Sequence, residues 1–403
     1  MSLKAKTAIV GVGASDWSRS SADSLAAMQV KAALAALDDA AIGLADIDGI
    51  LTTEGSRHAG DNPRVHTQIA EMLGLRQTNL AAAVPVGGGA CGLSIAIARW
   101  AVASGRCRAV LVLGSSKLAS VGGRTASGSG ATDSLALFRG HSPTFEQTFG
   151  PLIISFYASV AQRHMHEYGT THAQLAAVAV ACRRHASLNP EAIMREPISV
   201  EDVLASRPIS SPFNLLDCCI NSDGAAALVV MAADRARDTP RPVDILGLGH
   251  ASSSYFTGDL ALPREDMGFS LTSTVGRIAA GDAFAEAEVD RADVDFAELY
   301  DNFTITPLVQ LEDLGFCAKG EGGPFVEGGR IELGGELPVN THGGHLSCNF
   351  SPAGYNHWIE AVRQLRGDCG ERQVAGARLG LVSTVASTIA TYGGVGILAR
   401  GDA

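Results

Sequence analysis

The sequence lacks the features of a nucleic-acid-binding or membrane-spanning protein. Acidic residues outnumber basic ones, the formal net charge is −11, and no run of like charge occurs. Nucleic-acid-binding proteins usually carry a basic patch, so binding to nucleic acid is not expected. No apolar run reaches membrane-spanning length, and the start, MSLKAKTAIVGVG, lacks the layout of a signal peptide. We therefore expect a cytoplasmic protein without a membrane span.

Closely spaced cysteine pairs are also missing. None of the eight cysteines belongs to a CxxC pair, which zinc ribbons and thioredoxin-type redox sites require. Cys218 and Cys219 stand beside Asp217 without a spaced partner, and His164 and His166 fall on different faces of one helix. The sequence therefore predicts no metal site, and the cysteines are interpreted as reduced, mostly buried thiols.

Aromatic residues are few, at 5% of the chain, whereas glycine occurs 46 times and hydrophobic residues make up 46%. Glycine among so many apolar residues indicates close helix packing and tight turns, not disorder. With 403 residues, the chain is long enough for two cores of ordinary domain size.

The chain contains an internal repeat. AIVGVGAS (8–15) resembles DILGLGHAS (244–252), and AALAALDDAAIGLADIDGI (32–50) resembles AAGDAFAEAEVDRADVDFA (279–297). Each pair predicts a buried strand that ends in Gly-x-Gly, followed by an amphipathic helix. The first Gly-x-Gly lacks the third glycine of a dinucleotide-binding loop and recurs in the second half, so it indicates close packing at a strand end.

Both halves continue as alternating strands and helices. The first half shows a strand at Leu80–Val86, a turn at Gly87–Gly89, a helix at Leu93–Ser104 and a buried strand in CRAVLVLGSSK (107–117). The second shows a strand at Leu337–Val339, a helix at Trp358–Leu365 and two closing strands, GLVSTVAS (380–387) and GVGILAR (394–400). This alternation predicts an α/β fold with sheets covered by helices.

The halves are predicted to span residues 1–240 and 241–403 and to join near Asp238–Arg241. A segment from about 118 to 212 has no counterpart in the second half. It opens with a polar, glycine-rich stretch (120–134) and continues with two predicted helices in residues 154–169 and 171–190. Insertions of this length often form a lid or a substrate platform.

Two segments of the second half concentrate polar residues. ELYDNFT (298–304) ends a strand in Tyr, Asp and Asn, at the edge where α/β proteins gather their sites, although an Asp-Asn pair is also typical of a simple turn. NTHGGHLSCNF (340–350) crowds an amide, two histidines, a cysteine and paired glycines together. Loops so rich in polar groups are seldom only structural.

Together these features resemble the thiolase superfamily over nearly the whole chain. The resemblance rests on the duplicated halves, the insertion, LYDNFT (299–304) and NTHGG (340–344) with GYNHWIEAVRQLRG (354–367). LLDCCINSDGAAALVV (215–230) and LEDLGFCAKGEGGPFV (311–326) are similar to sterol-carrier-protein-type, or lipid-transfer, thiolases and to thiolase-like steroid side-chain aldolases.

The resemblance implies a five-layered αβαβα fold of two similar halves, with a loop domain inserted in the first. It also implies acyl-CoA substrates, with coenzyme A as part of the substrate and no tightly bound cofactor. It further implies a homodimer, with the strand near Cys107–Gly114 beside the subunit interface. For the aldolases, it implies a small OB-fold, zinc-ribbon partner protein.

Three chemical groups of a thiolase are absent at the positions that the resemblance assigns to them. The nucleophilic cysteine falls on Gly88, within AVPVGGGACG (83–92), the histidine on Phe350, and the second cysteine near Ala390. Claisen chemistry needs a thiolate and a histidine, which glycine and phenylalanine cannot replace. The bend instead exposes backbone N–H groups that can form an oxyanion hole for a thioester carbonyl or its enolate. The expected oxyanion and substrate-binding residues are Gly88, Gly89, Asn340, Gly343, Gly344 and Phe350.

The aldolase resemblance implies retro-aldol cleavage of a β-hydroxyacyl-CoA with a bulky acyl chain, such as a steroid or lipid. Tyr300 matches the first tyrosine of that family and is expected to take the hydroxyl proton. The second tyrosine falls on Phe350, so His345, His342 or Tyr355 would have to assist. Because a tyrosine normally titrates near pH 10, His342 or His345 is expected to lower the pKa of Tyr300.

Two alternatives stay open. Acetyl-CoA acetyltransferase or other acyltransferase chemistry would require Cys91 or Cys348 as a substitute nucleophile. A non-catalytic lipid-transfer or acyl-CoA-binding role is favoured by Phe350 and disfavoured by Tyr300 and the intact NTHGG segment.

Overall fold

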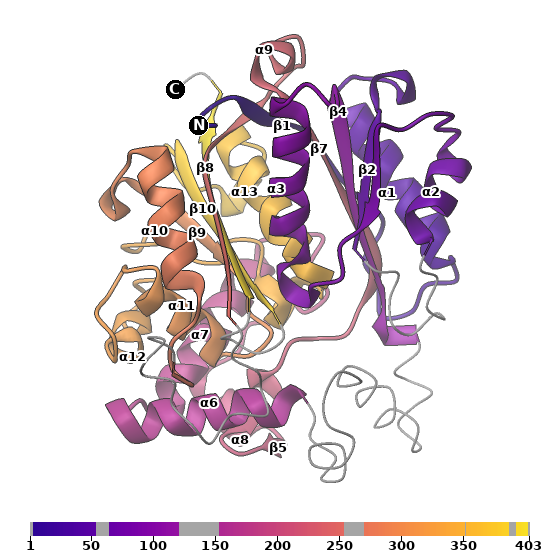
Figure 1. Cartoon of the computed structure of the whole chain (residues 1–403). Coiled ribbons are helices and arrows are strands. Elements are labelled where there is room, and N and C mark those ends of the chain that lie inside the picture. The colour runs from indigo at the N-terminus through magenta and orange to yellow at the C-terminus, as the bar shows by residue number, and fades with distance from the viewer. Residues whose placement is uncertain are drawn as a thin grey trace.

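The computed structural model of the chain describes residues 3–53, 64–120, 153–253, 270–350, 352–386 and 392–401. Within these residues, nine strands form one twisted sheet in the order β3-β2-β4-β7-β1-β8-β11-β10-β9 (Figure 1). The first half contributes β1 (Thr7–Ala14), α1 (Leu25–Asp39), β2 (Gly49–Thr52), α2 (Val65–Leu73), β3 (Leu80–Ala83), α3 (Ala90–Ala103), β4 (Ala109–Lys117), β7 (Asp223–Ala232) and α9 (Ala233–Ala236). The second contributes β8 (Val243–Ser252), α10 (Gly276–Ala287), β9 (Phe296–Leu299), α11 (Ile305–Asp313), α12 (Gly322–Val326), α13 (Tyr355–Arg366), β10 (Leu379–Ala386) and β11 (Tyr392–Arg400).

The helices divide into outer and central layers. α1 packs on β1, β7 and β4, and α10 packs on β8 and β11. α3 and α13 instead contact strands of both halves, so they form a central layer between the two parts of the sheet. Figure 1 shows α3 in this position, with strands of the first half on one side and of the second half on the other. The expected five-layered fold is confirmed.

The internal repeat corresponds to a packing device used twice. A Cβ atom at Gly11 would lie 2.1 Å from the carbonyl oxygen of Ala36, and one at Gly247 would lie 2.1 Å from that of Ala283. Only glycine allows the helix to approach the strand this closely. The Gly-x-Gly segments therefore hold helices against strands, as predicted.

Two ion pairs also follow the pseudo-symmetry and connect the halves. Arg99 of α3 reaches Glu286 of α10 at 2.7 Å, and Arg366 of α13 reaches Asp39 of α1 at 2.6 Å. Each arginine side chain is almost completely buried. Each central helix is thus tied to the outer helix of the opposite half.

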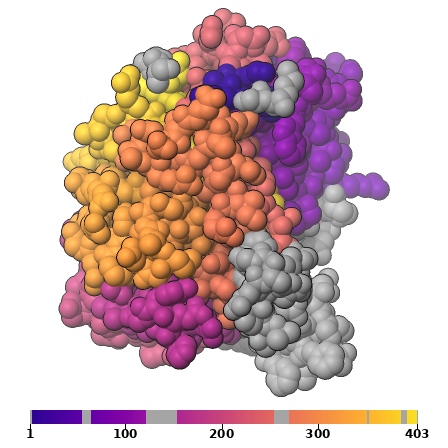
Figure 2. Space-filling model, turned by 60° about the vertical axis from the view of Figure 1, so that its left-hand side comes forward, coloured from indigo at the N-terminus to yellow at the C-terminus, as the bar shows by residue number. Residues whose placement is uncertain are grey.

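The insertion contributes α6 (Ile153–Tyr168), α7 (His172–Ser187), α8 (Val200–Ala205), β5 (Pro208–Ser210) and β6 (Phe213–Asn214). The two predicted helices are confirmed as α6 and α7, whereas most of the glycine-rich stretch lies outside the described residues. Although it leaves the first half, the insertion packs on the second, since Tyr157 and Leu175 share a hydrophobic cluster with Ile305 and Leu308. In Figure 2, α6 (magenta) accordingly lies below the orange surface of the second half.

Two sequence predictions need correction. The strand expected at Leu337–Val339 is reduced to a single parallel bridge between Val339 and Ala297. The segment Cys107–Gly114 cannot offer an edge to a second subunit, because β4 is hydrogen-bonded to β2 on one side and to β7 on the other. The sheet edge of this half is β3, which pairs only with β2 among the described residues.

Among the described residues, no helix combines the length and apolar character needed to cross a membrane.

Candidate active site

The glycine bend between β3 and α3 lies against Tyr300. Gly87–Gly89 forms one turn of 3-10 helix, and Gly87 has a positive φ of 61°. A Cβ atom at Gly88 would lie 2.2 Å from the carbonyl oxygen of Val385, and 2.8 Å and 3.0 Å from Cζ and Oη of Tyr300. The sequence placed Gly88 and Tyr300 in one site, and the structure brings them into contact.

Tyr300 follows the last residue of β9 and is buried except for 6% of its surface. Its backbone N–H donates to Ser383, and its carbonyl accepts from Gln310, so the main chain is fixed. No hydrogen bond to its hydroxyl is found among the described residues. Burial, and then the neighbouring Tyr157, raises the pKa of Tyr300 well above its usual value. The expectation that neighbouring histidines lower this pKa is therefore wrong.

His345 lies against Tyr300, and Phe350 lies against His345. The rings of Tyr300 and His345 meet edge to face, with centroids 4.9 Å apart and an interplanar angle of 89°. The centroid of the Phe350 ring is 4.9 Å from that of His345, with an interplanar angle of 49°. Tyr355 does not join this group, because its buried hydroxyl donates to the carbonyl of Leu113 at 2.7 Å.

Asp301 organises the loop that carries His345. Its carboxylate accepts the backbone N–H of His345 at 2.8 Å and of Leu346 at 3.2 Å, at the start of a π-helical turn (Gly344–Cys348). His357 of α13 donates from Nε2 to the same carboxylate at 3.0 Å. A Cβ atom at Gly344 would lie 1.9 Å from this carboxylate, so glycine is required there.

His342 is held by a second buried carboxylate. Its Nδ1 donates to Glu298 at 3.0 Å, and the ring of His342 meets that of His357 edge to face, with centroids 4.9 Å apart. Burial alone would lower the pKa of His342, but the hydrogen bond to Glu298 and the nearby carboxylates outweigh it and raise the pKa.

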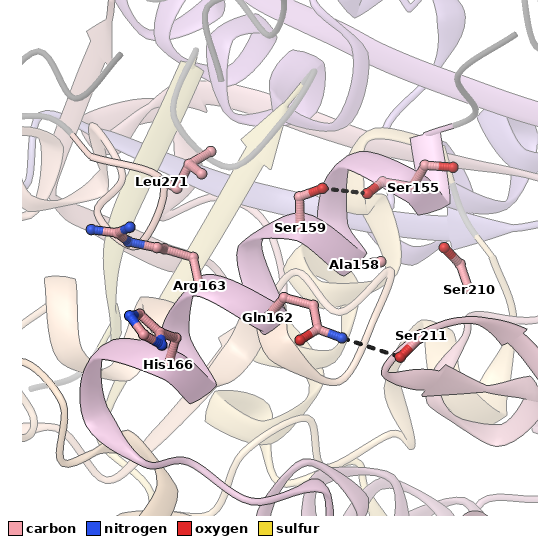
Figure 3. A pocket seen from close by; sticks show the side chains of 9 residues that line it. All are labelled: Ser155, Ala158, Ser159, Gln162, Arg163, His166, Ser210, Ser211 and Leu271. Atoms are coloured by element: carbon pink, nitrogen blue, oxygen red, sulfur yellow. Dashed lines mark hydrogen bonds between the residues drawn. The ribbon is translucent and has the colours of Figure 1, made fainter. Parts of the chain in front are cut away.

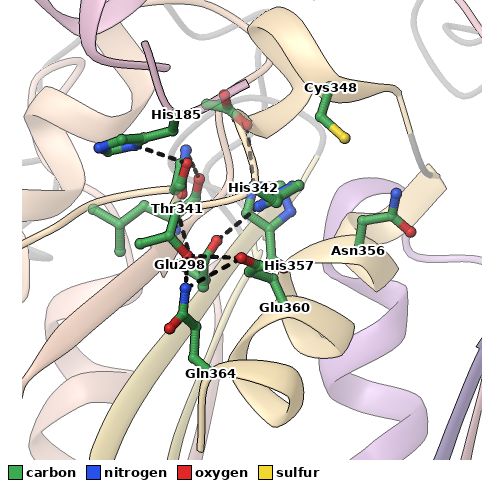
Figure 4. Close-up of polar contacts among 12 residues, drawn as sticks. His185, Glu298, Thr341, His342, Cys348, Asn356, His357, Glu360 and Gln364 are labelled. Atoms are coloured by element: carbon green, nitrogen blue, oxygen red, sulfur yellow. Dashed lines mark hydrogen bonds and ion pairs between the residues drawn. The ribbon is translucent and has the colours of Figure 1, made fainter. Parts of the chain in front are cut away.

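A polar network continues from Glu298 into the central layer. Thr341 donates its hydroxyl to Glu298 and is also 3.0 Å from the carboxylate of Glu360 (Figure 4). Burial opposes ionisation of Glu360, but its ion pair with Arg372 prevails and lowers its pKa to about 2. This network holds the loop around His342 in place, and the carboxylate of Glu360 within it is paired with Arg372.

A small cavity of about 20 Å³ adjoins this network, and its lining includes His342, Cys348 and Glu360. That volume is enough for about one water molecule. His342 Nε2 is buried and has no partner among the described protein groups. The cavity is therefore a suitable place for a water molecule next to His342.

Asn340 and Gly343, two of the expected oxyanion donors in the loop from Asn340 to Gly344, have other hydrogen-bond partners. The side-chain amide of Asn340 pairs with both the N–H and the C=O of Leu299, at 2.7 Å and 2.8 Å. The backbone N–H groups of Thr341 and Gly343 donate to Glu298 and to Asn340. Gly343 has a φ of 104° and packs on Ala186, so it is needed for the turn itself. The remaining oxyanion candidates are Gly344, for whose N–H no acceptor is found among the described residues, and Gly88 and Gly89. Gly88 and Gly89 stand at the N-terminus of α3, where helical N–H groups lack intrahelical acceptors.

The substitute nucleophiles are poorly placed. Cys91 is completely buried in an apolar cluster of α3, and burial raises the pKa of its thiol well above the usual value. Cys348 is buried, and its sulfur lies 3.4 Å from the side-chain nitrogen of Asn189. Burial, and then Glu360, also raises the pKa of Cys348. Thiolates are therefore disfavoured at both positions. Ala390, the position of the family's second cysteine, lies outside the described residues.

Sequence reasoning missed His357 and Glu298. Glu298 is the one charged residue in the strand FAEL of β9, two residues before Tyr300 and thus on the same strand face. His357 begins a buried polar stripe on α13 that continues with Glu360 and Gln364, at helical spacing. The available signals in the sequence were a charged residue within an apolar strand and polar residues at helical spacing on one face of α13.

Two surface hollows include residues of the insertion. One, of about 460 Å³, contains Arg19 and Arg183 and borders the site through Cys219 and Leu346. Neither arginine forms an ion pair with a carboxylate within the described part of the chain. The other, of about 650 Å³, is an open groove along α6, and its lining includes Gln162, Arg163, His166 and Ser210 of β5 (Figure 3).

Comparison with known proteins agrees with this architecture. Residues 264–400 match the family described as "Thiolase C-terminal domain-like". The chain is 36% identical over 378 residues to a 17-hydroxy-3-oxo-4-pregnene-20-carboxyl-CoA lyase of Mycobacterium tuberculosis, covering 91% of this chain and 92% of that protein. It is 35% identical over 391 residues to an acetyl-CoA acetyltransferase of Methanothermobacter thermautotrophicus, covering 94% and 96%. The solved structure of an "Ltp2-ChsH2(DUF35) aldolase" aligns with a TM-score of 0.82 at 32% identity, covering 99% of each chain.

Proposed function

The chain belongs to the thiolase superfamily, and we propose that it cleaves a C–C bond in β-hydroxyacyl-CoA thioesters with bulky acyl chains, without a cysteine nucleophile. The observation that carries this proposal is the contact between Gly88 and Tyr300. The position of the family's nucleophilic cysteine has no room for a side chain, and the phenol of Tyr300 lies there instead.

The reaction is a retro-aldol cleavage. The bond between the α- and β-carbons breaks, the β-hydroxyl loses its proton and becomes a ketone, and the α-carbon gains a proton to give a shorter acyl-CoA. We assign Tyr300 as a proton relay, which accepts the hydroxyl proton as it passes its own proton to the α-carbon. The phenol is neutral before and after this relay, so the mechanism does not need a phenolate in the resting enzyme.

Negative charge develops on the thioester oxygen as the bond breaks. The backbone N–H groups of Gly88 and Gly89 are the candidate donors to it, because they stand at the start of the 14-residue helix α3. The triple glycine thus supplies an oxyanion hole where a thiolase holds its acyl group.

Binding of the coenzyme A portion is assigned to the hollow with Arg19 and Arg183. Guanidinium groups without carboxylate partners are well suited to phosphate. Both residues line the same hollow, and the charge of Arg19 adds to burial in lowering the pKa of Arg183. An anion between them would relieve this repulsion.

We further propose a cytoplasmic homodimer that works with a small OB-fold, zinc-ribbon protein. The similar aldolase structure is named for a DUF35 component as well, which supports such a partner. All eight cysteines remain free thiols, which suits the cytoplasm. For the dimer, β3 is the proposed interface strand, because it ends the sheet of the first half among the described residues. Light scattering that gives a monomer mass at micromolar concentration would refute the dimer.

The experiment is to incubate the protein, alone and with a co-expressed DUF35-type partner, with a 17-hydroxy steroid side-chain CoA thioester. Mass spectrometry should find the ketone and the shortened acyl-CoA, and treatment with iodoacetamide should not reduce the rate. Saturable binding without cleavage would indicate a binding protein. Acyl transfer that iodoacetamide abolishes would indicate a thiolase.

A further inference from the structure

Three metal-ligating side chains converge next to Tyr300. Asp301 follows β9, His345 lies in the π-helical turn, and His357 lies in the first turn of α13, and all three are completely buried. His357 Nε2 is 3.0 Å from Asp301 Oδ1, and His345 Nδ1 is 3.8 Å from the same oxygen. The three ligand atoms lie within 4.8 Å of one another.

These separations suit a common ion. With zinc–ligand distances of about 2.0–2.2 Å, two ligands of a tetrahedral site lie roughly 3.4 Å apart. The two separations from Asp301 Oδ1 fall on either side of that value, so small side-chain rotations would place the three atoms around one ion. One carboxylate and two imidazoles form a donor set typical of zinc and of non-haem iron.

The surroundings of the carboxylate are also those of a metal site. Ligating carboxylates are usually held by further hydrogen bonds, and the N–H groups of His345 and Leu346 hold Asp301 here. Buried carboxylates are normally paired with a cation or bound to a metal. Glu360 has Arg372, whereas Asp301 forms no ion pair with lysine or arginine in the described ranges. A divalent ion would balance its charge.

We propose that Asp301, His345 and His357 bind one divalent transition-metal ion, with Zn²⁺ as the first candidate. The sequence predicted no metal site because its cysteines and histidines do not form a closely spaced metal-binding motif along the chain. These ligands come instead from three separate segments, which only the fold brings together. The ion would lie beside the proposed lyase site, where it would be able to act as a Lewis acid, but the proposal of metal binding does not depend on that function.

The test is metal binding itself. Protein expressed without a histidine tag and freed of metal with a chelator would be dialysed against Zn²⁺ or Co²⁺ and analysed by elemental mass spectrometry. We expect one ion per chain, a visible absorption spectrum of histidine-bound Co²⁺, and a higher unfolding temperature with metal than with chelator. His345→Gln and His357→Gln should each lose at least about 100-fold in affinity, more than the 10- to 100-fold that loss of a second-shell partner costs.

His172→Gln is the matched control. His172 also binds a buried aspartate, Asp217, at 2.8 Å, but it lies outside the cluster, so metal binding should persist.

If a ligand variant fails to fold, X-ray absorption spectra of the wild-type Co²⁺ protein still report whether two imidazoles coordinate the ion. Metal-free wild type that takes up neither Zn²⁺ nor Co²⁺ would overturn the proposal. Equal uptake by the His345→Gln/His357→Gln double variant would do so as well. The cluster would then be held by hydrogen bonds alone. Neither result depends on whether the lyase reaction occurs.

Discussion

The hydroxyl of Tyr300 lies 3.0 Å from the point that a Cβ atom at Gly88 would occupy. A residue after β9 in the second half thus fills the space beside the bend that begins α3 in the first. The two positions are far apart in the sequence but follow strands of the two pseudo-symmetric halves. The proposed cysteine-independent cleavage rests on this contact, and single substitutions at either position can test it.

Replacing Tyr300 by phenylalanine removes only the hydroxyl. If Tyr300 relays the proton, Tyr300→Phe should lower kcat by roughly 10²–10⁴-fold, as is typical for groups in general acid–base catalysis. Folding should be almost unchanged, because the hydroxyl has no protein partner among the described residues. The measurements are steady-state release of the shortened acyl-CoA and thermal unfolding.

Tyr355→Phe is the matched control. Its hydroxyl hydrogen-bonds the carbonyl of Leu113, so the change should cost about 1 kcal/mol of stability, with little effect on kcat. Equal turnover of wild type and Tyr300→Phe would rule out the relay.

Adding a methyl group at the bend tests the space at Gly88. Gly88→Ala would place Cβ 2.2 Å from the carbonyl oxygen of Val385, so the backbone or the phenol must move. We expect a loss of stability of about 1–3 kcal/mol, as for overpacked cores, together with loss of lyase activity.

Gly281→Ala provides the comparison for this substitution. Gly281 lies in α10, and a Cβ atom there would have nothing within 4 Å. Alanine should therefore stabilise the helix by about 0.5–1 kcal/mol. If chemical denaturation shows Gly88→Ala to be as stable as the wild type, the bend is not closed to side chains.

The sequence could predict those parts of the fold that hydrophobic periodicity and the internal duplication determine. The repeated Gly-x-Gly segments predicted close packing at the strand ends, which the contacts of Gly11 with Ala36 and of Gly247 with Ala283 show. Strand–helix alternation predicted an α/β fold, and the resemblance to thiolases implied the five layers. It could not predict pairs that depend on which helix face meets which strand. His357 meets Asp301 only because α13 lies in the central layer, and the ion pair of Arg99 with Glu286 crosses the two halves. Asn340 was expected in the oxyanion hole. The sequence does not reveal that both polar atoms of its side-chain amide are already hydrogen-bonded to the backbone of Leu299.

The arginine hollow predicts a defect in binding rather than in chemistry. Arg19→Gln should raise KM for a CoA thioester by roughly 10-fold, since a hydrogen bond to a charged group contributes about 1.5–3 kcal/mol. kcat should change little, because this residue is assigned to the coenzyme A portion and not to the reacting carbons. The wild-type KM should also rise with salt, and that of Arg19→Gln less steeply. A lower kcat with unchanged KM would contradict the assignment.

The last prediction concerns stability in acid and rests on His185. Leu333 N–H donates to His185 Nε2 at 3.0 Å, and Nδ1 lies 3.2 Å from the carbonyl of Asn340, so the buried ring is held neutral. Burial lowers its pKa to about 4, against about 6.5 in an unfolded chain. Between these values the unfolded chain binds a proton that the folded protein does not, so stability falls as pH falls from about 6.5 towards 4. The full loss amounts to about 3 kcal/mol.

In His185→Gln, the side-chain amide can still donate to Asn340 and accept from Leu333, but it does not titrate. Urea unfolding at pH 7 and at pH 4.5 should therefore show a clearly smaller loss of stability for His185→Gln than for the wild type. His250, whose pKa burial also lowers to about 4, is common to both proteins and cancels in the comparison. Equal losses would mean that His185 becomes protonated in the folded protein without cost.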